Sequence, residues 1–496
     1  MRAETLDPAA LDPAALAASA AARLAEGGFA EAVGLLRRWV GLDPHAVEAW
    51  VALGVGLSAA GRPEAALIAC DAALRLQSSH PGALCAKARL LQSRGEPSLA
   101  GALFRRALAV QPGLAEALFG LAGLAIDAGG WERAERWIAA LSKTTPLAFG
   151  VDWLRARIAL GRGDMAEAER RAAAALQPAD LTLAQRADIL LLQGVALDAL
   201  RRPAEAFAAA AAGKALQRRL YGERAGARET EPAKLDRLAA WFEGADPAPW
   251  RQVPAAPHGP DEPDEHVFLI GFPQSGTAAL ARALSAHPKV SALHEAPTLM
   301  AQARTFLGSA EGLAQLASLS DEEAAGWRAH YWADVNSLGA ATAGRVFIDV
   351  APAGTHALPV IAKLFPNAKL LFAVRDPRDV VLSCLLANRP ITPMTYAFTD
   401  LADAAGCYAA SMGMAAAYRR ALPLTVVEVR YEALARDFGV ELKAIADFLG
   451  LGVMRPMLAA PPAAADIGRW RAYANQLEPI LPILAPWIER FDYRAG

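Results

Sequence analysis

The chain has 496 residues, more than one ordinary domain requires, so we expect two or three domains. Its composition, 54% hydrophobic and 21% charged, is typical of a globular protein and excludes a disordered one. The formal net charge of −2 gives no global field that would attract nucleic acid or a membrane surface. Any anion site must therefore be local.

The N-terminal residues and the cysteines together predict the compartment. The first residues lack a basic segment followed by an apolar run, so we expect no secretory signal. No stretch reaches the roughly 18 apolar residues that a membrane span requires. The four cysteines form no CxxC pair and are too sparse for a disulfide framework. We therefore expect a cytoplasmic protein with reduced cysteines, and no metal.

The first half of the chain repeats with a period of 34 residues. Three columns of small residues keep this spacing: Gly27, Gly61, Gly95, Gly129 and Gly163; Ala32, Ala66, Ala100, Ala134 and Ala168; Ala20, Gly54, Ala88, Ala122 and Ala156. The glycine suits the turn between two helices, and the small residues let the two helices approach closely. A sixth helix–turn–helix unit follows after a four-residue slip, with Gly194 and Ala206 in equivalent places.

This pattern resembles the tetratricopeptide repeat over about residues 13–220. Such repeats stack into an α-solenoid with a concave surface. The resemblance implies a groove for a peptide or protein partner. A purely structural or dimerising array is the alternative, because repeat scaffolds carry function only through their surface residues.

The pattern changes after the repeats. Residues 221–265 are polar and rich in proline and acids, apart from one short expected helix, KLDRLAAWFEG, and we interpret them as a linker. From His266 onward, apolar runs alternate with amphipathic helices, which is typical of a parallel sheet with crossover connections. We expect strands at 267–271, 345–349, 369–374 and 425–429 in a three-layer α/β domain, with a mostly parallel sheet, that spans residues 266–496.

The first of these strands ends in a glycine- and serine-containing turn that precedes a helix. The turn runs from Gly271 through Gln274, Ser275, Gly276 and Thr277. Its backbone N–H groups and the helix N-terminus favour an anion. It is no Walker A loop, because the lysine is missing, so a P-loop kinase using Mg²⁺ is disfavoured. A purely structural turn is the alternative.

A second segment adds a guanidinium group and a hydroxyl. Arg375 follows the strand at 369–374, and Ser383 lies about two helical turns further along. An arginine fork and a hydroxyl donor can bind one phosphate together. In the alternative interpretation, the charged residues within 375–379 form ion pairs on the surface, and Ser383 is an ordinary helix residue without a binding role.

Together the two segments resemble the sulfotransferase family, and specifically its tyrosylprotein-sulfotransferase-like bacterial branch with tetratricopeptide repeats. The resemblance spans about residues 266–493 and includes Tyr431 in a Y-E-x-L stretch, FLGL at 448–451 and IGRWRAY at 467–473. It implies a P-loop-like fold that binds 3′-phosphoadenosine 5′-phosphosulfate (PAPS), with 3′,5′-ADP as the product, at the carboxyl ends of the strands.

The resemblance also implies roles for individual residues. The donor-binding residues would be Gln274, Ser275, Gly276 and Thr277 at the 5′-phosphosulfate, Arg375 and Ser383 at the 3′-phosphate, with Tyr431 and Arg469 near the nucleotide. Glu295 lies at the family's glutamate position, as a general base for the acceptor hydroxyl. Its alternative role is a helix-start carboxylate, and His294 or His356 could replace it as the base.

The chain departs from the family pattern where the chemistry occurs. Gln274 stands for an arginine and Ala278 for a hydroxyl donor. Val350 stands for the lysine that stabilises the leaving oxygen, and Gly354 for an asparagine. The apolar segment 458–466 replaces a polar one that lines the family's acceptor site. Since the loss of one preorganised donor typically costs on the order of 10²–10³ in rate, several losses predict a poor enzyme unless other residues compensate.

Two functions therefore stay open. The first is a sulfotransferase that moves a sulfuryl group from PAPS to a hydroxyl on a peptide or protein, a glycan or a metabolite. The second is a catalytically weakened sulfotransferase fold that serves as a binding or scaffold protein, with the repeats as its working surface. Retained Arg375, Ser383 and Arg469 favour donor binding in both.

Overall fold

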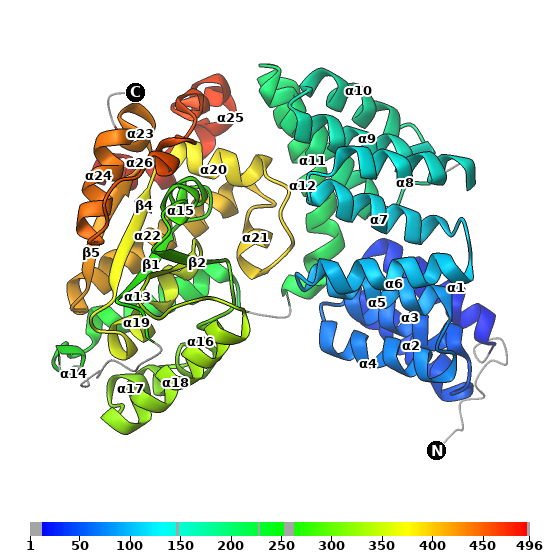
Figure 1. Cartoon of the computed structure of the whole chain (residues 1–496), viewed down its shortest axis with the longest axis horizontal. Coiled ribbons are helices and arrows are strands. Elements are labelled where there is room, and N and C mark those ends of the chain that lie inside the picture. Colours follow the sequence, from blue (N-terminus) through cyan, green and yellow to red (C-terminus); the bar gives the residue numbers. More distant parts are fainter. Residues whose placement is uncertain (1–11, 145–147, 227–228, 252–261, 494–496) are drawn as a thin grey trace. The chain divides into compact units, whose positions relative to one another are not determined.

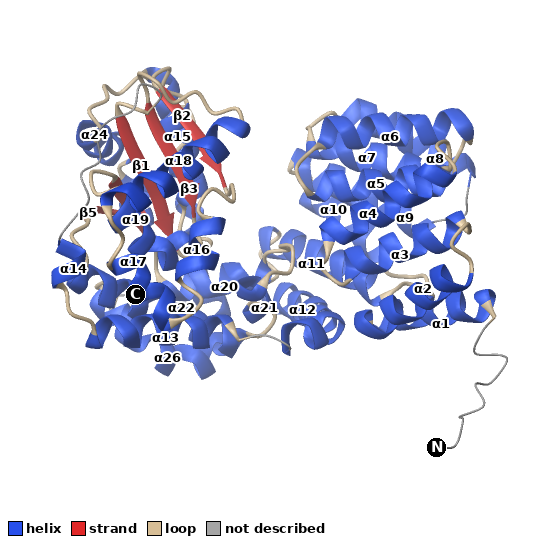
Figure 2. Cartoon of the chain, turned by 90° about the horizontal axis from the view of Figure 1, so that it is seen from below, coloured by secondary structure: helices blue, strands red, loops and turns tan. Residues whose placement is uncertain are grey.

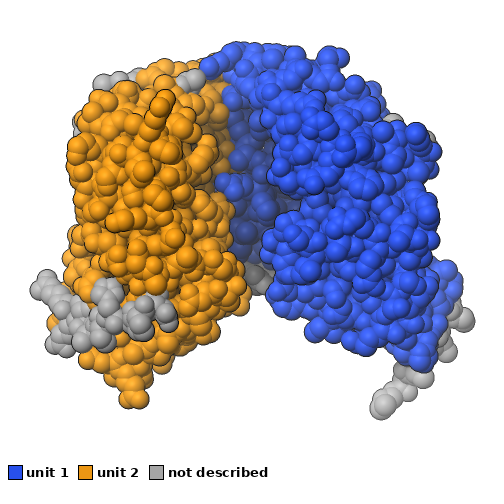
Figure 3. Space-filling model, in the orientation of Figure 1, with its two compact units in different colours: residues 1–228, 386–400 blue, residues 229–385, 401–496 orange. Residues whose placement is uncertain are grey.

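The computed structural model describes residues 12–144, 148–226, 229–251 and 262–493, and it separates into two compact units (Figures 1 and 3). Unit 1 comprises residues 1–228 and 386–400, and unit 2 comprises residues 229–385 and 401–496. Residues 227–228 and 252–261 of the segment interpreted as a linker lie outside the described residues. None of the helices in the described part of the chain is long and apolar enough to span a membrane.

Unit 1 is a series of helix pairs in which each helix packs on the next. Its helices are α1 (Pro13–Glu26), α2 (Phe29–Leu42), α3 (Val47–Ala59), α4 (Pro63–Leu76), α5 (Pro81–Ser93), α6 (Pro97–Val110), α7 (Ala115–Asp127), α8 (Trp131–Thr144), α9 (Ala148–Arg162), α10 (Met165–Ala175), α11 (Leu183–Ala199), α12 (Pro203–Gly226) and α21 (Pro393–Ala397). Figure 1 shows the stacked pairs in blue to green. The expected solenoid of helical repeats is confirmed.

The turn within each pair requires a left-handed backbone. The five expected turn glycines have φ between 69° and 91°, a region that glycine enters without steric cost: Gly27, Gly61, Gly95, Gly129 and Gly163. In the sixth pair, Arg201 takes this place with φ of 60°. The four-residue slip in the sequence thus preserves the geometry of the turn without a glycine.

Small residues let the paired helices touch. The alanines of the column that begins at Ala32 are all completely buried: Ala32, Ala66, Ala100, Ala134 and Ala168. A Cβ at Gly54 would lie 2.7 Å from Cys70 Sγ, and one at Gly194 would lie 3.2 Å from the carbonyl oxygen of Ala206. These positions therefore exclude larger side chains because the neighbouring helix occupies the space.

Residues 386–400, which include α21, belong to unit 1 although they lie far along the chain. Lys214 of α12 is 2% exposed, and its Nζ donates to the carbonyl oxygen of Ala387 at 2.8 Å. Asn388 Nδ2 donates to Asp188 Oδ1 of α11 at 3.2 Å. A buried lysine requires such a partner, so this segment is an integral part of the helical unit.

Unit 2 contains a five-stranded sheet in the order β2-β3-β1-β4-β5 with every neighbouring pair parallel. The strands are β1 (Glu265–Gly271), β2 (Val290–His294), β3 (Val346–Ala351), β4 (Lys369–Val374) and β5 (Thr425–Arg430). Four of them confirm the expected strands, and β2 is an addition that the sequence analysis did not predict. Figure 2 shows the strands side by side with their arrowheads toward one edge.

Helices cover both faces of this sheet. The α-helices of unit 2 are α13 (Glu231–Gly244), α14 (Ala248–Arg251), α15 (Thr277–Ser285), α16 (Met300–Phe306), α17 (Ala310–Ala317), α18 (Asp321–Ser337), α19 (Leu358–Leu364), α20 (Pro377–Leu386), α22 (Leu401–Ala421), α23 (Tyr431–Arg436), α24 (Phe438–Phe448), α25 (Ala474–Leu477) and α26 (Leu481–Arg490). Short 3₁₀ helices are η2 (Gly354–Ala357), η3 (Arg455–Leu458), η4 (Ala464–Asp466), η5 (Arg469–Tyr473) and η6 (Glu478–Ile480).

The two faces have different cores. On one face, α15 and α24 pack on aliphatic side chains of the strands, such as Leu269 and Ile348. On the other face, aromatic side chains meet: Phe268 lies 6.2 Å from Tyr331 of α18, and Phe272 lies 5.1 Å from Tyr408 of α22, between ring centres. The alternation of side chains along each parallel strand supplies both faces. The result is the expected three-layer α/β unit, with a sheet that is parallel throughout.

Candidate active site

The site lies at the carboxyl edge of the sheet, where the five strands end side by side. The turn after β1 has two left-handed residues, Gln274 with φ of 70° and Gly276 with φ of 96°. Ser275 and Thr277 are 3% and 4% exposed, and α15 starts at Thr277. This geometry brings successive backbone N–H groups to a helix N-terminus, an arrangement that attracts an anion.

Arg375 leaves the end of β4 and crosses to this turn. Its Nη1 donates to the carbonyl oxygen of Gln274 at 3.2 Å, and its Nη2 donates to that of Asp466 at 2.9 Å. The residue is 6% exposed, and its Nε is buried without a hydrogen-bond partner. Because a buried donor without a partner is costly, this atom is a candidate for binding a ligand oxygen.

Tyr431 starts α23 at the end of β5 and packs between Arg375 and the turn. The guanidinium carbon of Arg375 lies 4.5 Å from the centre of the Tyr431 ring. A Cβ at Gly276 would lie 2.5 Å from Tyr431 Cδ2, so only glycine fits there. Burial, and next the charge of Asp466, raises the pKa of Tyr431 to about 12. Tyr431 is therefore neutral, and its hydroxyl donates to the carbonyl oxygen of Ala463 at 3.1 Å.

Ser383 and Arg469 form a second group at the same edge. Arg469 Nη2 donates to Ser383 Oγ at 3.2 Å, although the two residues come from α20 and η5. Asp466, three residues before Arg469, accepts from Arg375. The predicted donor residues therefore meet in two adjacent groups, one around Arg375 and the turn and one around Ser383, and residues 466–469 connect the two groups.

The charged residues that follow β4 are not surface ion pairs, which corrects that alternative. Asp376 and Asp379 are 6% and 1% exposed. Asp376 pairs with Arg378 at 2.7 Å, and Asp379 accepts hydrogen bonds from two backbone N–H groups. Ser383, at 8% exposed, is likewise buried. The segment is part of the interior of the site.

Glu295 directly follows β2, so it is no helix-start carboxylate; α16 begins only at Met300. Its φ of 51° is left-handed, and its N–H donates to the carbonyl oxygen of Val350 at 2.8 Å. Such a conformation is uncommon for a residue with a side chain and is often found at functional positions. Since β3 separates β2 from β1 and neighbouring strands lie about 4.8 Å apart, Glu295 is roughly 10 Å along the edge from the turn.

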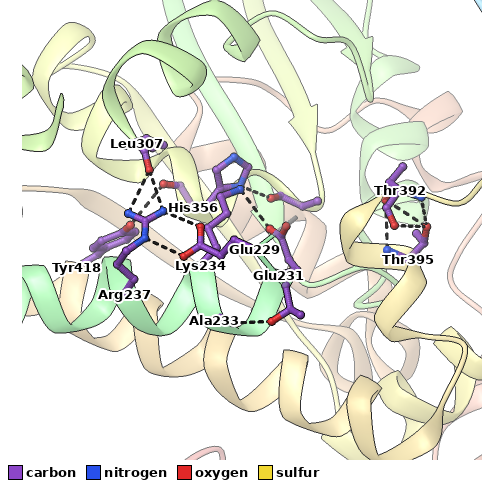
Figure 4. A network of polar contacts seen from close by, with 12 residues as sticks. Glu229, Glu231, Ala233, Lys234, Arg237, Leu307, His356, Thr392, Thr395 and Tyr418 are labelled. Atoms are coloured by element: carbon purple, nitrogen blue, oxygen red, sulfur yellow. Dashed lines mark hydrogen bonds and ion pairs between the residues drawn. The ribbon is translucent and has the colours of Figure 1, made fainter. Parts of the chain in front are cut away.

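Two histidines were the alternative bases. His294 is the exposed last residue of β2. His356 lies in η2, where its Nδ1 is 2.9 Å from the carbonyl oxygen of Ala353 and therefore carries the proton. Burial, and next the charge of Lys234, lowers the pKa of His356 to about 4, so the ring is neutral at neutral pH. Figure 4 shows His356 beside the ion pair of Lys234 with Glu231 on α13.

The departures from the family pattern also have structural consequences. Val350 is 2% exposed and belongs to the aliphatic core on the α15 face. Its neighbour Asp349 is completely buried, accepts from Thr298 Oγ1 at 2.6 Å and from the Tyr331 hydroxyl at 3.0 Å, and leaves Oδ1 without a partner. Gly354 lies against Ala351, whose Cβ would be 2.8 Å from an added Cβ. Position 350 therefore brings no cation to the edge.

A pocket of about 290 Å³ adjoins the Glu295 segment. Its lining mixes apolar and charged side chains: Pro297, Met300, Ala301, Arg304, Asp334, Ser337 and Leu338. Pro297 is two residues from Glu295, so the wall of the pocket begins within about 7 Å of that residue along the backbone. The pocket is therefore lined mainly by residues of α16 and the end of α18, and Glu295 itself is not part of its lining.

Some residues of the site escaped the sequence analysis. Asp379 holds the backbone of the second group through the Gly468 N–H, and the Asp466 carbonyl oxygen links this group to Arg375. Asp349 accepts from Thr298 Oγ1 in the segment after Glu295. Of these residues, only Asp379 could have been found from the sequence. It lies in the Arg-Asp-Pro-Arg-Asp segment, where acidic residues that alternate with arginines next to a strand end indicate ion pairs or hydrogen bonds. Their partners are too distant in sequence to be recognised by spacing.

The residues at this edge have the chemistry to attract an anionic group. Two arginines, a buried serine hydroxyl and a left-handed turn at a helix N-terminus converge, and Arg375 Nε lacks a partner. Within the described residues, no three His, Cys, Asp or Glu side chains gather as metal ligands. The chain thus combines a parallel α/β unit, which carries two arginines at the carboxyl edge of its sheet, with a helical repeat unit.

Both units match known protein families. Residues 266–455 match the sulfotransferase family, and residues 91–149 match the tetratricopeptide repeat. Unit 2 therefore contains a sulfotransferase-family domain, and unit 1 contains tetratricopeptide repeats.

The chain is also similar to several solved structures. One is a tetratricopeptide repeat protein from Parabacteroides merdae, 18% identical over 47% of this chain and 91% of that chain, with a TM-score of 0.31. A second is PilW, a widely conserved type IV pilus biogenesis factor, 18% identical over 41% and 92%, with a TM-score of 0.33. A third is YrrB, a TPR protein with an unusual peptide-binding site, 18% identical over 34% and 88%, with a TM-score of 0.25.

Proposed function

We propose that this protein transfers a sulfuryl group from PAPS to a hydroxyl acceptor. The observation that carries the proposal is the convergence of the turn after β1, Arg375 and the Ser383–Arg469 pair at one edge of a sulfotransferase-family domain. PAPS supplies a sulfuryl group already joined to a phosphate leaving group. The protein has to bind that donor, orient the acceptor and remove its proton.

Donor binding is assigned to the residues with buried cationic and hydroxyl groups. The turn residues Gln274, Ser275, Gly276 and Thr277 would hold the 5′-phosphosulfate through backbone N–H groups and the Thr277 hydroxyl. Arg375, Ser383 and Arg469 would hold the 3′-phosphate, because guanidinium groups form charge-assisted bonds to phosphate oxygens. Tyr431 would support the nucleotide through its stacking on Arg375.

Proton removal is assigned to Glu295. It is exposed, sits at the carboxyl edge and has its backbone fixed by β3. A base there would take the proton of an acceptor hydroxyl held in the adjoining pocket of about 290 Å³. A peptide or protein, a glycan and a metabolite are all acceptors with such a hydroxyl. Among these acceptors we favour a peptide or protein, because the tetratricopeptide repeats that precede the domain offer a surface for protein binding.

One observation favours a second candidate, a weakened sulfotransferase fold that binds the nucleotide and works through its repeats. Val350 is a core residue where the family pattern has a catalytic lysine. Loss of a cation at a leaving group is expected to cost on the order of 10²–10³ in rate. In this candidate, the repeat groove binds a protein partner and the α/β unit acts as a nucleotide-responsive scaffold.

Calorimetric titration with 3′,5′-ADP, using 5′-AMP as the matched control, tests the donor site first. Selective binding of 3′,5′-ADP is expected, because only this nucleotide can occupy the Ser383–Arg469 group. Labelled PAPS, offered with tyrosine peptides, glycans and phenols, then separates the two candidates. Transfer supports the enzyme, whereas binding without transfer to any acceptor supports the scaffold. Equal or absent binding of both nucleotides would refute the PAPS site.

A further inference from the structure

Asp379 is a buried carboxylate whose hydrogen bonds reach a segment 89 residues further along the chain. Its Oδ2 accepts from the Gly468 N–H at 2.7 Å, and its Oδ1 accepts from the Trp470 N–H at 2.8 Å. The residue is 1% exposed. Both carboxylate oxygens are thus committed to the backbone on either side of Arg469.

The two bonds fix the backbone from which Arg469 extends. Arg469 lies between the two donors, and its side chain reaches Ser383 at 3.2 Å. Asp379 and Ser383 are four residues apart on α20, so they lie one turn apart on the same face of that helix. One face of α20 therefore contacts both the backbone on either side of Arg469 and the side chain of Arg469.

Other contacts tie down the rest of residues 463–470, which we call the strap. The Tyr431 hydroxyl donates to the carbonyl oxygen of Ala463, and Arg375 donates to that of Asp466. At the other end, the guanidinium carbon of Arg378 lies 3.7 Å from the ring centre of Trp470. The strap is therefore anchored by residues from the ends of β4 and β5, and Asp379 provides its two backbone anchors next to Arg469.

We propose that Asp379 is a positioning residue that gives the site its preference for 3′-phosphorylated adenosine nucleotides, by holding Arg469 beside Ser383. This inference rests on the proposed donor site. Asp379 itself does not contact the nucleotide in this proposal, since both of its oxygens bind the strap. It acts through the position of Arg469, the cation that meets the 3′-phosphate together with the Ser383 hydroxyl.

The chemistry of the side chain supports this role. Burying a negative charge beside a site for anions costs free energy, unless hydrogen bonds to the carboxylate compensate for that cost. Only a carboxylate offers two acceptor oxygens in this geometry, whereas an asparagine would turn an NH₂ group toward one of the two N–H donors. Burial raises the pKa of Asp379 to about 6. The hydrogen bond from the Trp470 N–H and the charge of Arg375 act in the opposite direction and lower this pKa, but by less.

The test compares Asp379→Asn with the wild-type protein by titration with 3′,5′-ADP and 5′-AMP. We expect the affinity for 3′,5′-ADP to fall about tenfold or more, while 5′-AMP changes little, because only the 3′-phosphate contact depends on Arg469. Glu231→Gln is the matched control: it also removes a buried carboxylate from unit 2, but one that pairs with Lys234 on α13. Its ratio of the two affinities should equal that of the wild type.

Hydrogen exchange gives a reading of the strap that does not depend on a ligand. In Asp379→Asn, the amide protons of Gly468 and Trp470 should exchange faster than in the wild type, while those of the sheet stay protected. Loss of protection throughout unit 2 would instead mean that the variant is unfolded. In that case Asp379→Glu, which keeps both oxygens, is compared for partial rescue of the affinity ratio.

The pH dependence adds a third reading. The charged groups that face Asp379 are Arg375 and Asp376. Protonation of Asp379 below about pH 6 should lower the preference of the wild type for 3′,5′-ADP, and Asp379→Asn should lack this change. The second ionisation of the phosphates, near pH 6, affects both proteins alike and cancels in their comparison.

The outcomes separate the two proposals. If the wild type binds 3′,5′-ADP selectively and Asp379→Asn keeps the same ratio of affinities, the role of Asp379 is refuted and the donor site stands. If the wild type shows no selectivity for 3′,5′-ADP, both the donor site and the role of Asp379 are refuted. A lowered ratio together with faster exchange at Gly468 and Trp470 supports the inference.

Discussion

The guanidinium group of Arg375 stacks on the ring of Tyr431, with 4.5 Å between the guanidinium carbon and the ring centre. This contact joins the ends of β4 and β5, and the same ring closes against Gly276 in the turn after β1. Stacking on an aromatic face leaves the edge of the guanidinium group available for hydrogen bonds in the plane. The tyrosine therefore orients the arginine toward the turn and the strap.

Arg375→Ala should weaken 3′,5′-ADP binding about 100-fold, and Arg375→Lys about tenfold. Lysine keeps the charge but loses the planar fork and the stack on Tyr431. Calorimetric titration measures both variants, and thermal unfolding checks that each one folds. Unchanged affinity in a folded Arg375→Ala variant would refute the assignment of Arg375 to the 3′-phosphate.

Glu295→Gln should leave 3′,5′-ADP affinity within about twofold of the wild type and reduce sulfuryl transfer about 10²–10⁴-fold, because the amide cannot take the acceptor proton. Transfer of labelled sulfuryl from PAPS to the acceptor found for the wild type measures the change. Glu322→Gln, at an exposed position on α18, is the control. Full turnover in Glu295→Gln would show that the base lies elsewhere, and His356 would be the next variant.

Asp349 should make the stability of unit 2 depend on pH in an unusual direction. Burial raises its pKa from 3.8 to about 6, although Thr298 and Tyr331 donate hydrogen bonds to it. Between about pH 4 and pH 6, Asp349 has therefore lost its proton in the unfolded chain but retains it in the folded protein. Stability from this group is therefore present below about pH 4 and is lost as pH rises to about 6. At pH 7 the loss is about 3 kcal/mol.

Urea unfolding of Asp349→Asn and wild type from pH 4 to pH 7 measures this contribution. The variant should gain stability relative to the wild type by up to about 3 kcal/mol as pH rises, since it has no proton to lose. Asp447→Asn, at an exposed position on α24, controls for the removal of one carboxylate. A relative stability that does not change with pH would contradict the raised pKa.

Two glycines of α7 should respond to alanine with opposite signs. A Cβ at Gly120 would lie 2.3 Å from the buried Phe104 ring, so Gly120→Ala should destabilise unit 1 by about 1–3 kcal/mol through overpacking. A Cβ at Gly123 would have its nearest contact, Arg157 Nη1, at 3.6 Å. Gly123→Ala should therefore stabilise the helix by about 0.5–1 kcal/mol. Thermal unfolding compares the two variants, and equal shifts would contradict the packing argument.

The amino-acid sequence by itself determined the repeat register, four of the five strands, and the residues that gather at the carboxyl edge. These features depend on local rules. A left-handed turn requires glycine or a tolerated substitute every 34 residues, and an apolar run bounded by turns forms a buried strand. In a parallel sheet, residues that follow the strands necessarily meet at one edge, which brought together Gln274, Arg375 and Tyr431.

The tertiary structure alone decided the features that depend on distant partners. Strand β2 is only partly buried and has no clear apolar pattern, so its pairing with β3 defines it. Residues 386–400 belong to unit 1, where Ala387 accepts from the buried Lys214 and Asn388 donates to Asp188. Asp379 becomes an anchor only when the backbone of Gly468 and Trp470 reaches it. Such contacts are set by which groups must satisfy one another once buried, and spacing along the chain carries no record of that choice.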